Sequence, residues 1–406
     1  MKCARCGSPR FAVKRMRTGN PMCKECFMLS FEEEVHQTII EEKLFEKGEI
    51  VAIGVSGGKD STCLLHILTT LNQRYNYGLD IRLVAIDEGI YGYRDFSLEC
   101  VKENSEKYSL PLVILSFKDL FGYTMDEINN IVGTKKSKCT HCGIFRRKAL
   151  EIGCQQIGAN KIALGHNADD YAETILMNLM RGDIHRLERS GDITTGKDFL
   201  SSELPKLLKL REANSKNEKA DEKSSLSVEE CAKDANEASE PNLLLTSSET
   251  KASSSMPPTF IVPTLKVKPF KYSYQREIVL YCHFKKLNFF SVECTYAQAS
   301  FRGYARQFLV KLQESYPMVI GNIIHSSSMM HVSSSTPSQK MQFCRNCGFI
   351  SSQQKCQACV LIDELKSEEK RKETTCEVSE KDASEELTAC SEKKGLAVQK
   401  DMEDIV

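Results

Sequence analysis

The sequence predicts an α/β protein whose central sheet is parallel and carries helices on both faces. Four short runs of β-branched and apolar residues have the character of strands, at 50–55, 81–86, 111–115 and 161–165. Stretches with helical spacing of apolar residues lie between them, and this alternation is typical of a doubly wound parallel sheet. With 406 residues and 41% hydrophobic content, the chain can bury one such core and still carry small additional modules.

Two stretches have a composition that disfavours a packed core. Ser, Glu, Lys, Asn and Ala dominate residues 197–258, and the chain after Glu364 is a mixed-charge tail. Such segments cannot bury enough apolar surface to offset their ordering entropy. We therefore expect an N-terminal cysteine module (1–30), a first part of the α/β domain (31–196), a disordered insertion (197–258), a second part of the domain (259–325), a linker (326–340), a C-terminal cysteine module (341–363) and a disordered tail (364–406).

Charge and hydropathy give no sign of a membrane or of general polyanion binding. The 55 basic residues balance 55 acidic ones, so any contact with nucleic acid must come from local basic patches. No run of about eighteen apolar residues occurs, and the residues that follow Met1 lack the apolar stretch of a secretory signal. We expect a cytoplasmic protein without membrane attachment.

Cysteine spacing predicts metal sites at both ends of the chain. The sequence contains 18 cysteines, and in a chain of this size without a signal sequence metal ligation is a better interpretation than disulfides. Paired CxxC motifs have the spacing of structural four-cysteine Zn²⁺ sites, and metal binding would supply much of the folding energy of such short modules. The two predicted ligand sets are Cys3, Cys6, Cys23 and Cys26, and Cys344, Cys347, Cys356 and Cys359.

Basic residues suggest contact with RNA but do not establish it. The first module carries Arg10, Lys14, Arg15 and Arg17, for which a purely structural setting is an equally good interpretation. Many of the other basic side chains can equally lie on solvated helix faces. These further candidates are Arg146, Arg147, Lys148, Arg181, Arg186, Arg189, Arg302 and Arg306.

A glycine-rich turn between the first strand and the next helix is the central chemical motif. It consists of Ser56, Gly57, Gly58, Lys59, Asp60 and Ser61. A strand that runs into such a turn and then a helix directs backbone N–H groups at one point, where the helix dipole also favours an anion. Gly57 and Gly58 allow close approach and Lys59 supplies a cation. A turn that merely joins strand to helix is the alternative, but the full hexapeptide in this context favours nucleotide phosphates.

A second polar cluster follows the strand at 161–165. It contains Gly165, His166, Asn167, Asp169 and Asp170. Because the carboxyl ends of parallel strands line one crevice, this cluster is expected to face the glycine-rich turn. Asp169 and Asp170 then suit Mg²⁺ binding or the organisation of reacting groups. Alternatively, both are first-turn helix residues that the helix dipole stabilises.

Three further cysteines form a third candidate group. Cys139 and Cys142 are a CxxC pair outside both terminal modules, and such a pair alone can bind zinc, form a redox disulfide or simply pack. With Cys294 as a third thiolate, the group suits an iron–sulfur cluster with one open iron that can carry or activate sulfur. Spacing does not distinguish Cys294 from Cys154 or Cys282 as the third ligand.

The hexapeptide resembles the SGGxDS signature of the PP-loop ATP pyrophosphatases, which have an adenine nucleotide alpha hydrolase-like fold. Members of that superfamily cleave ATP between its α and β phosphates and attach AMP to a carbonyl oxygen of the substrate, so that a nucleophile can displace it. The GxxxxGK[ST] signature is absent from this sequence, which disfavours transfer of the γ-phosphate.

More extended matches make the chain similar to the catalytic subunits of cytoplasmic tRNA 2-thiolation complexes, a family within that superfamily. They cover about residues 1–190 and 261–362. The matching segments are Cys3–Arg10, Ile86–Ile90, Gly92–Arg94, Cys139–Gly143, Gly165–Asn167 and Cys344–Gly348. This resemblance implies an ATP-dependent tRNA sulfurtransferase.

The resemblance also implies roles for individual residues. Ser56 to Ser61, with Gly165, would bind ATP and Mg²⁺, and Ile86 would meet the adenine. Cys139, Cys142 and Cys294 would hold a [4Fe–4S] or [3Fe–4S] cluster. The residues implied to be catalytic are Lys59, Asp169, Asp170, Cys139 and Cys294.

The implied reaction adenylates C2 of the wobble uridine and then replaces its oxygen with sulfur, as part of mcm5s2U formation. The implied partners are tRNA, a thiocarboxylated ubiquitin-related modifier as sulfur donor, and a paralogous second subunit. Two other classes remain open from the residues alone. One is a PP-loop enzyme that adenylates a small molecule, and the other is a non-catalytic zinc-ribbon subunit that binds tRNA.

Overall fold

The computed structural model describes residues 1–133, 138–196, 200–201, 205, 263–292, 294–296, 301–330 and 341–372. The predicted insertion therefore lies outside the described residues apart from three positions, and so does the predicted tail after residue 372. Among the described residues, no helix combines the length and the apolar character needed to cross a membrane.

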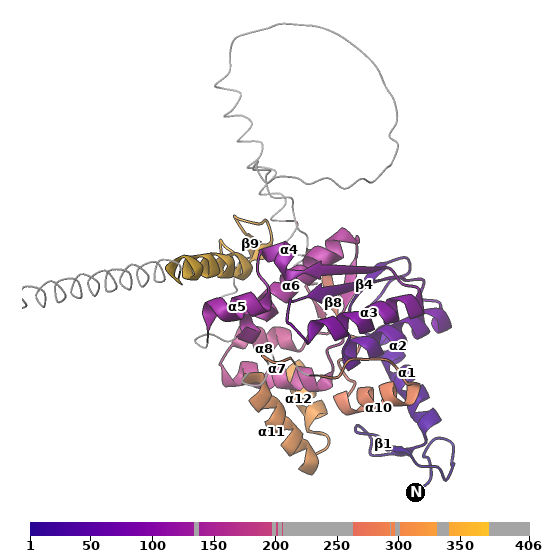
Figure 1. Cartoon of the computed structure of the whole chain (residues 1–406). Coiled ribbons are helices and arrows are strands. Elements are labelled where there is room, and N and C mark those ends of the chain that lie inside the picture. Colours follow the sequence, from indigo (N-terminus) through magenta and orange to yellow (C-terminus); the bar gives the residue numbers. More distant parts are fainter. Residues whose placement is uncertain are drawn as a thin grey trace, which may run out of the picture.

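A six-stranded sheet forms the centre of the molecule, in the order β5-β4-β3-β6-β8-β7 (Figure 1). Its strands are β3 (Ile50–Gly54), β4 (Asp80–Asp87), β5 (Leu112–Ser116), β6 (Lys161–Ala163), β7 (Thr194–Thr195) and β8 (Leu265–Val267). Neighbouring strands are parallel, except that β7 runs antiparallel to β8 at the edge. The mostly parallel sheet and its first four parallel strands confirm the prediction. The strands β7 and β8 were not predicted, because two or three residues are too few to show an alternating pattern.

Helices cover both faces of this sheet. The side chains of β3 alternate, so that Val51 and Ile53 pack into one core while Ala52 packs into the other. The first core is covered by α1 (Lys24–Glu41), α2 (Lys59–Tyr75), α3 (Arg94–Tyr108) and α10 (Gln275–Lys285). The second is covered by α4 (Phe117–Phe121), α5 (Met125–Val132) and α6 (Lys138–Gln156). The arrangement is the doubly wound one that the sequence predicts.

A further group of helices packs beside the sheet, around α7 (Figure 1). It comprises α7 (Ala168–Met180), α8 (Ile184–Ser190), α11 (Phe301–Ser315) and α12 (Val319–Ser328). Because α12 continues through its three final serines, the linker expected from residue 326 does not begin there. Ile320 and Ile324 are buried against α7 and Ser327 is buried too, so tertiary packing overrides the weak helix preference of serine.

The N-terminal cysteine module is attached to the α/β domain through α1 and an ion pair. It consists of the hairpin β1 (Val13–Lys14) and β2 (Pro21–Met22) and the start of α1. Arg15, which we considered for RNA contact, is instead buried: Arg15 Nε lies 2.8 Å from Glu277 Oε1, and both side chains are 2% exposed. This contact spans 262 residues of sequence, so no local pattern could have revealed it.

Replacing Arg15 by Met is expected to lower the thermal midpoint of unfolding by about 5 °C. The change leaves Glu277 as a buried charge without its main partner, which costs about 3 kcal/mol. Differential scanning calorimetry of the zinc-loaded chain measures the shift. Arg5→Met is the matched control, because Arg5 pairs with Glu33 at an exposed site and its loss is expected to change the midpoint by less than about 2 °C.

The C-terminal cysteine module packs on the opposite face of the sheet, beside α4 and α6 (Figure 1). It contains β9 (Gln342–Phe343), β10 (Ile350–Ser351) and a helix that the structure describes over 357–372. This helix passes the boundary expected at residue 363. Leu365 is buried in the same core as Phe121, and Tyr123 donates a hydrogen bond to Glu369 at 2.9 Å, which explains why helical order continues into the predicted tail.

Candidate active site and cysteine centres

The glycine-rich turn connects β3 to α2 and leaves the N-terminus of α2 open. Gly58 is the N-cap of this helix and no side chain caps it, so the first N–H groups are directed outward without an intrahelical acceptor. Gly57 has φ +78°, and a Cβ there would lie 2.4 Å from the carbonyl oxygen of Ser97. Only glycine fits this shape, which presents amides and the positive end of a helix dipole to an anion.

Side chains of the turn stabilise its own shape. Ser61 Oγ donates to the carbonyl of Gly58 at 3.0 Å and accepts from the amide of Ser56 at 3.2 Å. Lys59 Nζ lies 3.3 Å from Asp60 Oδ2, with both side chains partly exposed. The structure therefore brings the six predicted residues together as one loop with a cation at its mouth.

The polar cluster after β6 packs directly against this loop. Asn167 donates to Asp60 Oδ1 at 3.0 Å. A Cβ on Gly165 would lie 2.9 Å from the carbonyl carbon of Asp60, so the two loops approach closely only because residue 165 is glycine. The clusters at the ends of β3 and β6 thus face each other as the sequence suggested. Ile86, at the end of the neighbouring strand β4, is buried.

The two adjacent aspartates of α7 have different surroundings. Asp169 Oδ2 accepts from the amide of Gln275 at 2.7 Å, which joins α7 to α10, and burial raises the pKa of Asp169. Asp170 forms a capping box with Asn167. Both therefore also have the helix-terminal roles that we kept as the alternative. Burial raises the pKa of Asp60, and nearby Asp170 adds to that rise. Asp60 and Asp170 thus offer two partly exposed carboxylates in one place, a donor set that suits Mg²⁺.

Cys139, Cys142 and Cys294 line one small cavity. Its volume is about 200 Å³, several times the roughly 30 Å³ that one water occupies. Cys139 Sγ donates to the carbonyl of Tyr296 at 3.5 Å, and Arg146 Nη2 donates to Cys142 Sγ at 3.3 Å. Burial raises the pKa of Cys142 to about 11 and also raises that of Cys294, and metal coordination is what turns such thiols into thiolates at neutral pH.

The spread of these three sulfurs suits a cluster better than a single ion. Among the described residues, the cysteine groups whose Sγ atoms all lie within 4.8 Å of one another are the two terminal quartets, and the trio is not one of them. Thiolates of an iron–sulfur cluster each bind a different iron, so they stand farther apart than ligands that share one zinc. The donor set therefore fits a cluster.

The other two cysteines considered as third ligand lie elsewhere. Cys154 is buried near the end of α6, where burial raises its pKa to about 12. Cys282 is buried beneath the glycine-rich turn at residues 56–61, which we call the phosphate loop. Its Sγ donates to the carbonyl of Lys59 at 3.6 Å. Of the three candidates, Cys294 alone lines the cavity with Cys139 and Cys142, which spacing could not show.

Both terminal quartets have the compactness of a single metal site. The sulfurs of Cys3, Cys6, Cys23 and Cys26 lie within 4.8 Å of one another, and so do those of Cys344, Cys347, Cys356 and Cys359. Backbone N–H groups lower the pKa of Cys3 to about 6, whereas burial raises that of Cys26 to about 12. Four thiolates held this close together repel one another. A divalent cation among the four sulfurs removes that repulsion, so each quartet fits zinc.

A basic cleft adjoins the polar cluster after β6. Its volume is about 640 Å³, and its lining includes His166 and Asp170. Burial lowers the pKa of His166 to about 4 and that of Lys268 to about 8. Its cationic lining is Arg147, Arg181, Arg186, Arg189, Lys268 and Arg302. The sequence had singled out all of these except Lys268, whose burial beside the cleft is visible only in the fold.

Two of the basic candidates lie on α11 and form ion pairs within the protein. Arg302 and Arg306 on α11 form ion pairs with buried Glu173 on α7, at 3.0 and 2.7 Å. These contacts hold α11 against α7. Arg302 nevertheless lines the basic cleft, while Arg306 does not.

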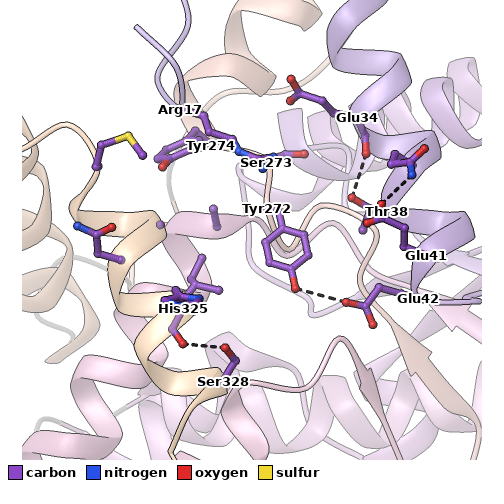
Figure 2. A pocket seen from close by; sticks show the side chains of 16 residues that line it. Arg17, Glu34, Thr38, Glu41, Glu42, Tyr272, Ser273, Tyr274, His325 and Ser328 are labelled. Atoms are coloured by element: carbon purple, nitrogen blue, oxygen red, sulfur yellow. Dashed lines mark hydrogen bonds between the residues drawn. The ribbon is translucent and has the colours of Figure 1, made fainter.

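A different cavity, of about 520 Å³, lies where the N-terminal module meets α12 and the turn before α10. Figure 2 shows Glu34, Glu41 and Glu42 along its α1 side, with Glu42 accepting a hydrogen bond from Tyr272. None of the predicted ATP-binding, cluster or catalytic residues lines it, although Arg17, a candidate for RNA contact, does. Its carboxylates make it unsuitable for a polyanion, which leaves the basic cleft as the better place for nucleic acid.

Sequence reasoning missed two buried charges beside the phosphate loop. Arg94 Nη1 donates to the carbonyl of Ser56 at 3.1 Å, and Arg94 Nε lies 3.1 Å from Glu88 Oε2. Both residues belong to segments that carried the family resemblance, but they had no assigned role. The signal that could have found them is the placement of two opposite charges just after a buried strand.

Comparisons with known proteins agree with this geometry. A family model described as a PP-loop domain matches residues 28–190. The cytoplasmic tRNA 2-thiolation protein 1 of Chlamydomonas reinhardtii is 44% identical over 365 residues, which cover 89% of this chain and 84% of that protein. The proteins of the same name from Xenopus laevis and Arabidopsis thaliana are 43% and 42% identical, over 90% and 89% of this chain and 88% and 84% of their own lengths.

A solved structure shares the fold. It is the U34-tRNA thiolase NcsA from Methanococcus maripaludis with its [4Fe–4S] cluster, which superposes with a TM-score of 0.61 at 24% identity and covers 89% of this chain and 95% of that one. These relatives match 89–90% of the chain. The chain belongs to the family of cytoplasmic tRNA 2-thiolation protein 1.

Proposed function

We propose that this chain is an ATP-dependent tRNA sulfurtransferase that converts the wobble uridine of cytoplasmic tRNAs to 2-thiouridine. The names of its relatives and of the thiolase with the same fold support this function. The observation that carries it is the adjacency of two chemical centres. A line of contacts through Arg94, Glu88 and Arg146 joins the phosphate loop to Cys142.

The phosphate loop activates the substrate. ATP phosphates bind the open amides of α2, with Ile86 at the adenine and Gly165 at the wall of the site, while Asp60 and Asp170 hold Mg²⁺. The C2 oxygen of uridine attacks the α-phosphorus, the bond to the β-phosphate breaks, and pyrophosphate leaves with its charge balanced by Lys59. Asp169 keeps α7 and α10 in place beside this reaction through Gln275.

The cysteine trio serves the second half of the reaction. An iron–sulfur cluster held by Cys139, Cys142 and Cys294 supplies a metal-bound position for sulfur when it is present. Ile90, Met125 and Tyr296 contribute apolar and aromatic side chains to the lining of the cavity. The sulfur of a thiocarboxylate donor adds to C2 of the adenylated uridine, AMP leaves with the original oxygen, and water then hydrolyses the acyl–sulfur bond to give 2-thiouridine and a carboxylate. We propose a thiocarboxylated ubiquitin-related modifier as the sulfur source and a paralogous protein as second subunit.

The basic cleft holds the RNA. The wobble base must leave its stack to reach Asp170 and the phosphate loop, so the flanking phosphates lie along the cleft. Zinc in the two terminal quartets keeps the modules folded on opposite faces of the sheet.

The double variant Arg186→Ala, Arg189→Ala is expected to weaken tRNA binding about tenfold or more. Each arginine that contacts a phosphate also contributes roughly one unit to the slope of log K against log salt, so that slope should become shallower by about two. Filter binding across a salt series measures both quantities. Arg82→Ala is the control, because Arg82 lies near the start of β4 and does not line the basic cleft. It should change neither the affinity nor the salt slope. Equal losses in the control and the variant would mean that the RNA binds elsewhere.

The direct test of the function uses purified chain, ATP, an unmodified tRNA and a sulfide donor under anaerobic conditions. The expected products are pyrophosphate, AMP and 2-thiouridine, the last detected by mass spectrometry of digested tRNA. Pyrophosphate release that responds to a small molecule instead of tRNA indicates a different adenylating enzyme. Binding of tRNA without any pyrophosphate indicates a non-catalytic subunit.

A further inference from the structure

Glu88 lies between the two proposed centres and contacts an arginine on each side. It follows β4 directly, and its side chain is 4% exposed. Glu88 Oε2 lies 3.1 Å from Arg94 Nε, and Glu88 Oε1 lies 2.8 Å from Arg146 Nη2. A buried carboxylate is costly unless cations compensate it, so both arginines are held at this point by one charge.

Each arginine also contacts one of the two centres. Arg94 donates to the carbonyl of Ser56 in the phosphate loop at 3.1 Å. Arg146 donates to Cys142 Sγ at 3.3 Å. Loop, glutamate and cysteine come from three separate parts of the chain, the β3–α2 turn, the residue after β4, and α6. The structure therefore contains a continuous line of polar contacts from the nucleotide loop to a cluster ligand.

We propose that Glu88 is a positioning residue for both centres: it holds Arg94 against the phosphate loop and Arg146 against Cys142. This inference rests on the proposed function and names how its two halves are joined. The three side chains carry one excess positive charge, which favours phosphate at one end and thiolate at the other. Glu88 itself touches neither substrate nor cluster.

The two arginines in this line of contacts differ in how firmly they are held. Arg94 is 4% exposed and also donates to Ser97 Oγ at 2.9 Å, whereas the side chain of Arg146 is 47% exposed. Glu88 Oε2 and Arg94 Nε form an ion pair but are not aligned as a hydrogen bond. Their link is therefore electrostatic and does not depend on hydrogen-bond geometry. Among the described interactions, Glu88 is the buried ionic partner of Arg146, so its loss lets the half-exposed Arg146 side chain turn into solvent.

The test uses full-length, zinc-loaded, iron-free protein that carries Cys139→Ser, so that the peptide of residues 139–146 reports Cys142 alone. One readout is the Kd for a non-hydrolysable ATP analogue. The other is the rate constant for alkylation of Cys142 by iodoacetamide at a fixed pH, followed by mass spectrometry. Glu88→Gln keeps the shape and removes the charge. It is expected to raise the Kd about tenfold and to change the alkylation rate constant about tenfold, because Arg146 no longer lies against Cys142.

Glu277→Gln is the matched control, because it neutralises another buried glutamate that pairs with an arginine, at Arg15. It is expected to leave both readouts within about twofold of the parent protein. If Glu88→Gln folds and changes one readout or neither, the proposal is wrong. A parent protein that binds no ATP analogue would instead contradict the proposed function, so the two failures are distinguishable.

Arg146→Met decides the matter if Glu88→Gln does not fold. Arg146 is half exposed, so its loss leaves the core intact. Arg146 donates to Cys142 Sγ at 3.3 Å, so its loss is expected to change the rate constant for alkylation of Cys142 about tenfold. An unchanged rate constant overturns the proposal, because Arg146 would then have no effect on Cys142.

Discussion

Gly57→Ala is expected to weaken ATP binding more than about 100-fold and to abolish detectable thiolation. Gly57 has φ +78°, and its new Cβ would lie 2.4 Å from a backbone carbonyl oxygen that cannot swing away as a side chain could. Either the turn opens or α3 moves, and a displacement of about 1 Å near the reacting groups costs on the order of 100-fold. Isothermal titration with a non-hydrolysable ATP analogue measures the loss.

Gly58→Ala is the control for this prediction. Its Cβ meets only Ser56 Oγ, at 3.4 Å, and its φ is an ordinary one. We expect less than about a tenfold loss of binding, from the weaker N-cap alone. Equal losses for the two variants would mean that the turn tolerates a Cβ at residue 57 and that ATP does not depend on its shape.

Cys294→Ala is expected to remove most of the iron and to lower 2-thiouridine formation by about 100-fold or more, while zinc content stays unchanged. Mutation of a residue that hydrogen-bonds to a metal ligand commonly lowers metal affinity or activity 10–100-fold. Loss of a ligand itself should lower them at least as much. Tyr296 and Cys139 keep the segment near α6, so the α/β domain should remain folded. Metal analysis after anaerobic reconstitution, with nucleoside analysis of the product tRNA, measures both effects.

Cys154→Ala and Cys282→Ala are the controls, because both thiols are buried away from the cavity of the cysteine trio. Each is expected to retain iron and activity while losing some stability through a small internal cavity. Iron that persists in Cys294→Ala but disappears in one of the controls would reassign the third ligand.

The sequence could predict those parts of the fold and site that local patterns encode. Short runs of β-branched and apolar residues identified the strands that carry the site, and the hexapeptide after the first of them identified the phosphate loop. Paired CxxC motifs identified both terminal quartets, whose sulfurs the structure brings within 4.8 Å of one another. In each case the residues that act together are close in sequence.

Features that depend on distant parts of the chain could not be predicted. Arg15 looked available for RNA, yet its partner Glu277 is 262 residues away. Cys294 could not be distinguished from Cys154 and Cys282 as a candidate third ligand until the fold placed it in the same cavity as Cys139 and Cys142, at the start of α6. Glu88 had no visible role, because its importance comes from burial between two arginines on different helices.

The most direct test of the central claim follows the oxygen of the target base. A tRNA transcript is prepared with heavy oxygen at C2 of its wobble uridine and is converted by the purified chain with ATP and a sulfur donor. If the phosphate loop adenylates the carbonyl that sulfur then attacks, the heavy oxygen leaves in AMP, in equal amount to the 2-thiouridine formed. AMP without the label would show that ATP cleavage and sulfur insertion act on different atoms, and the account would be wrong.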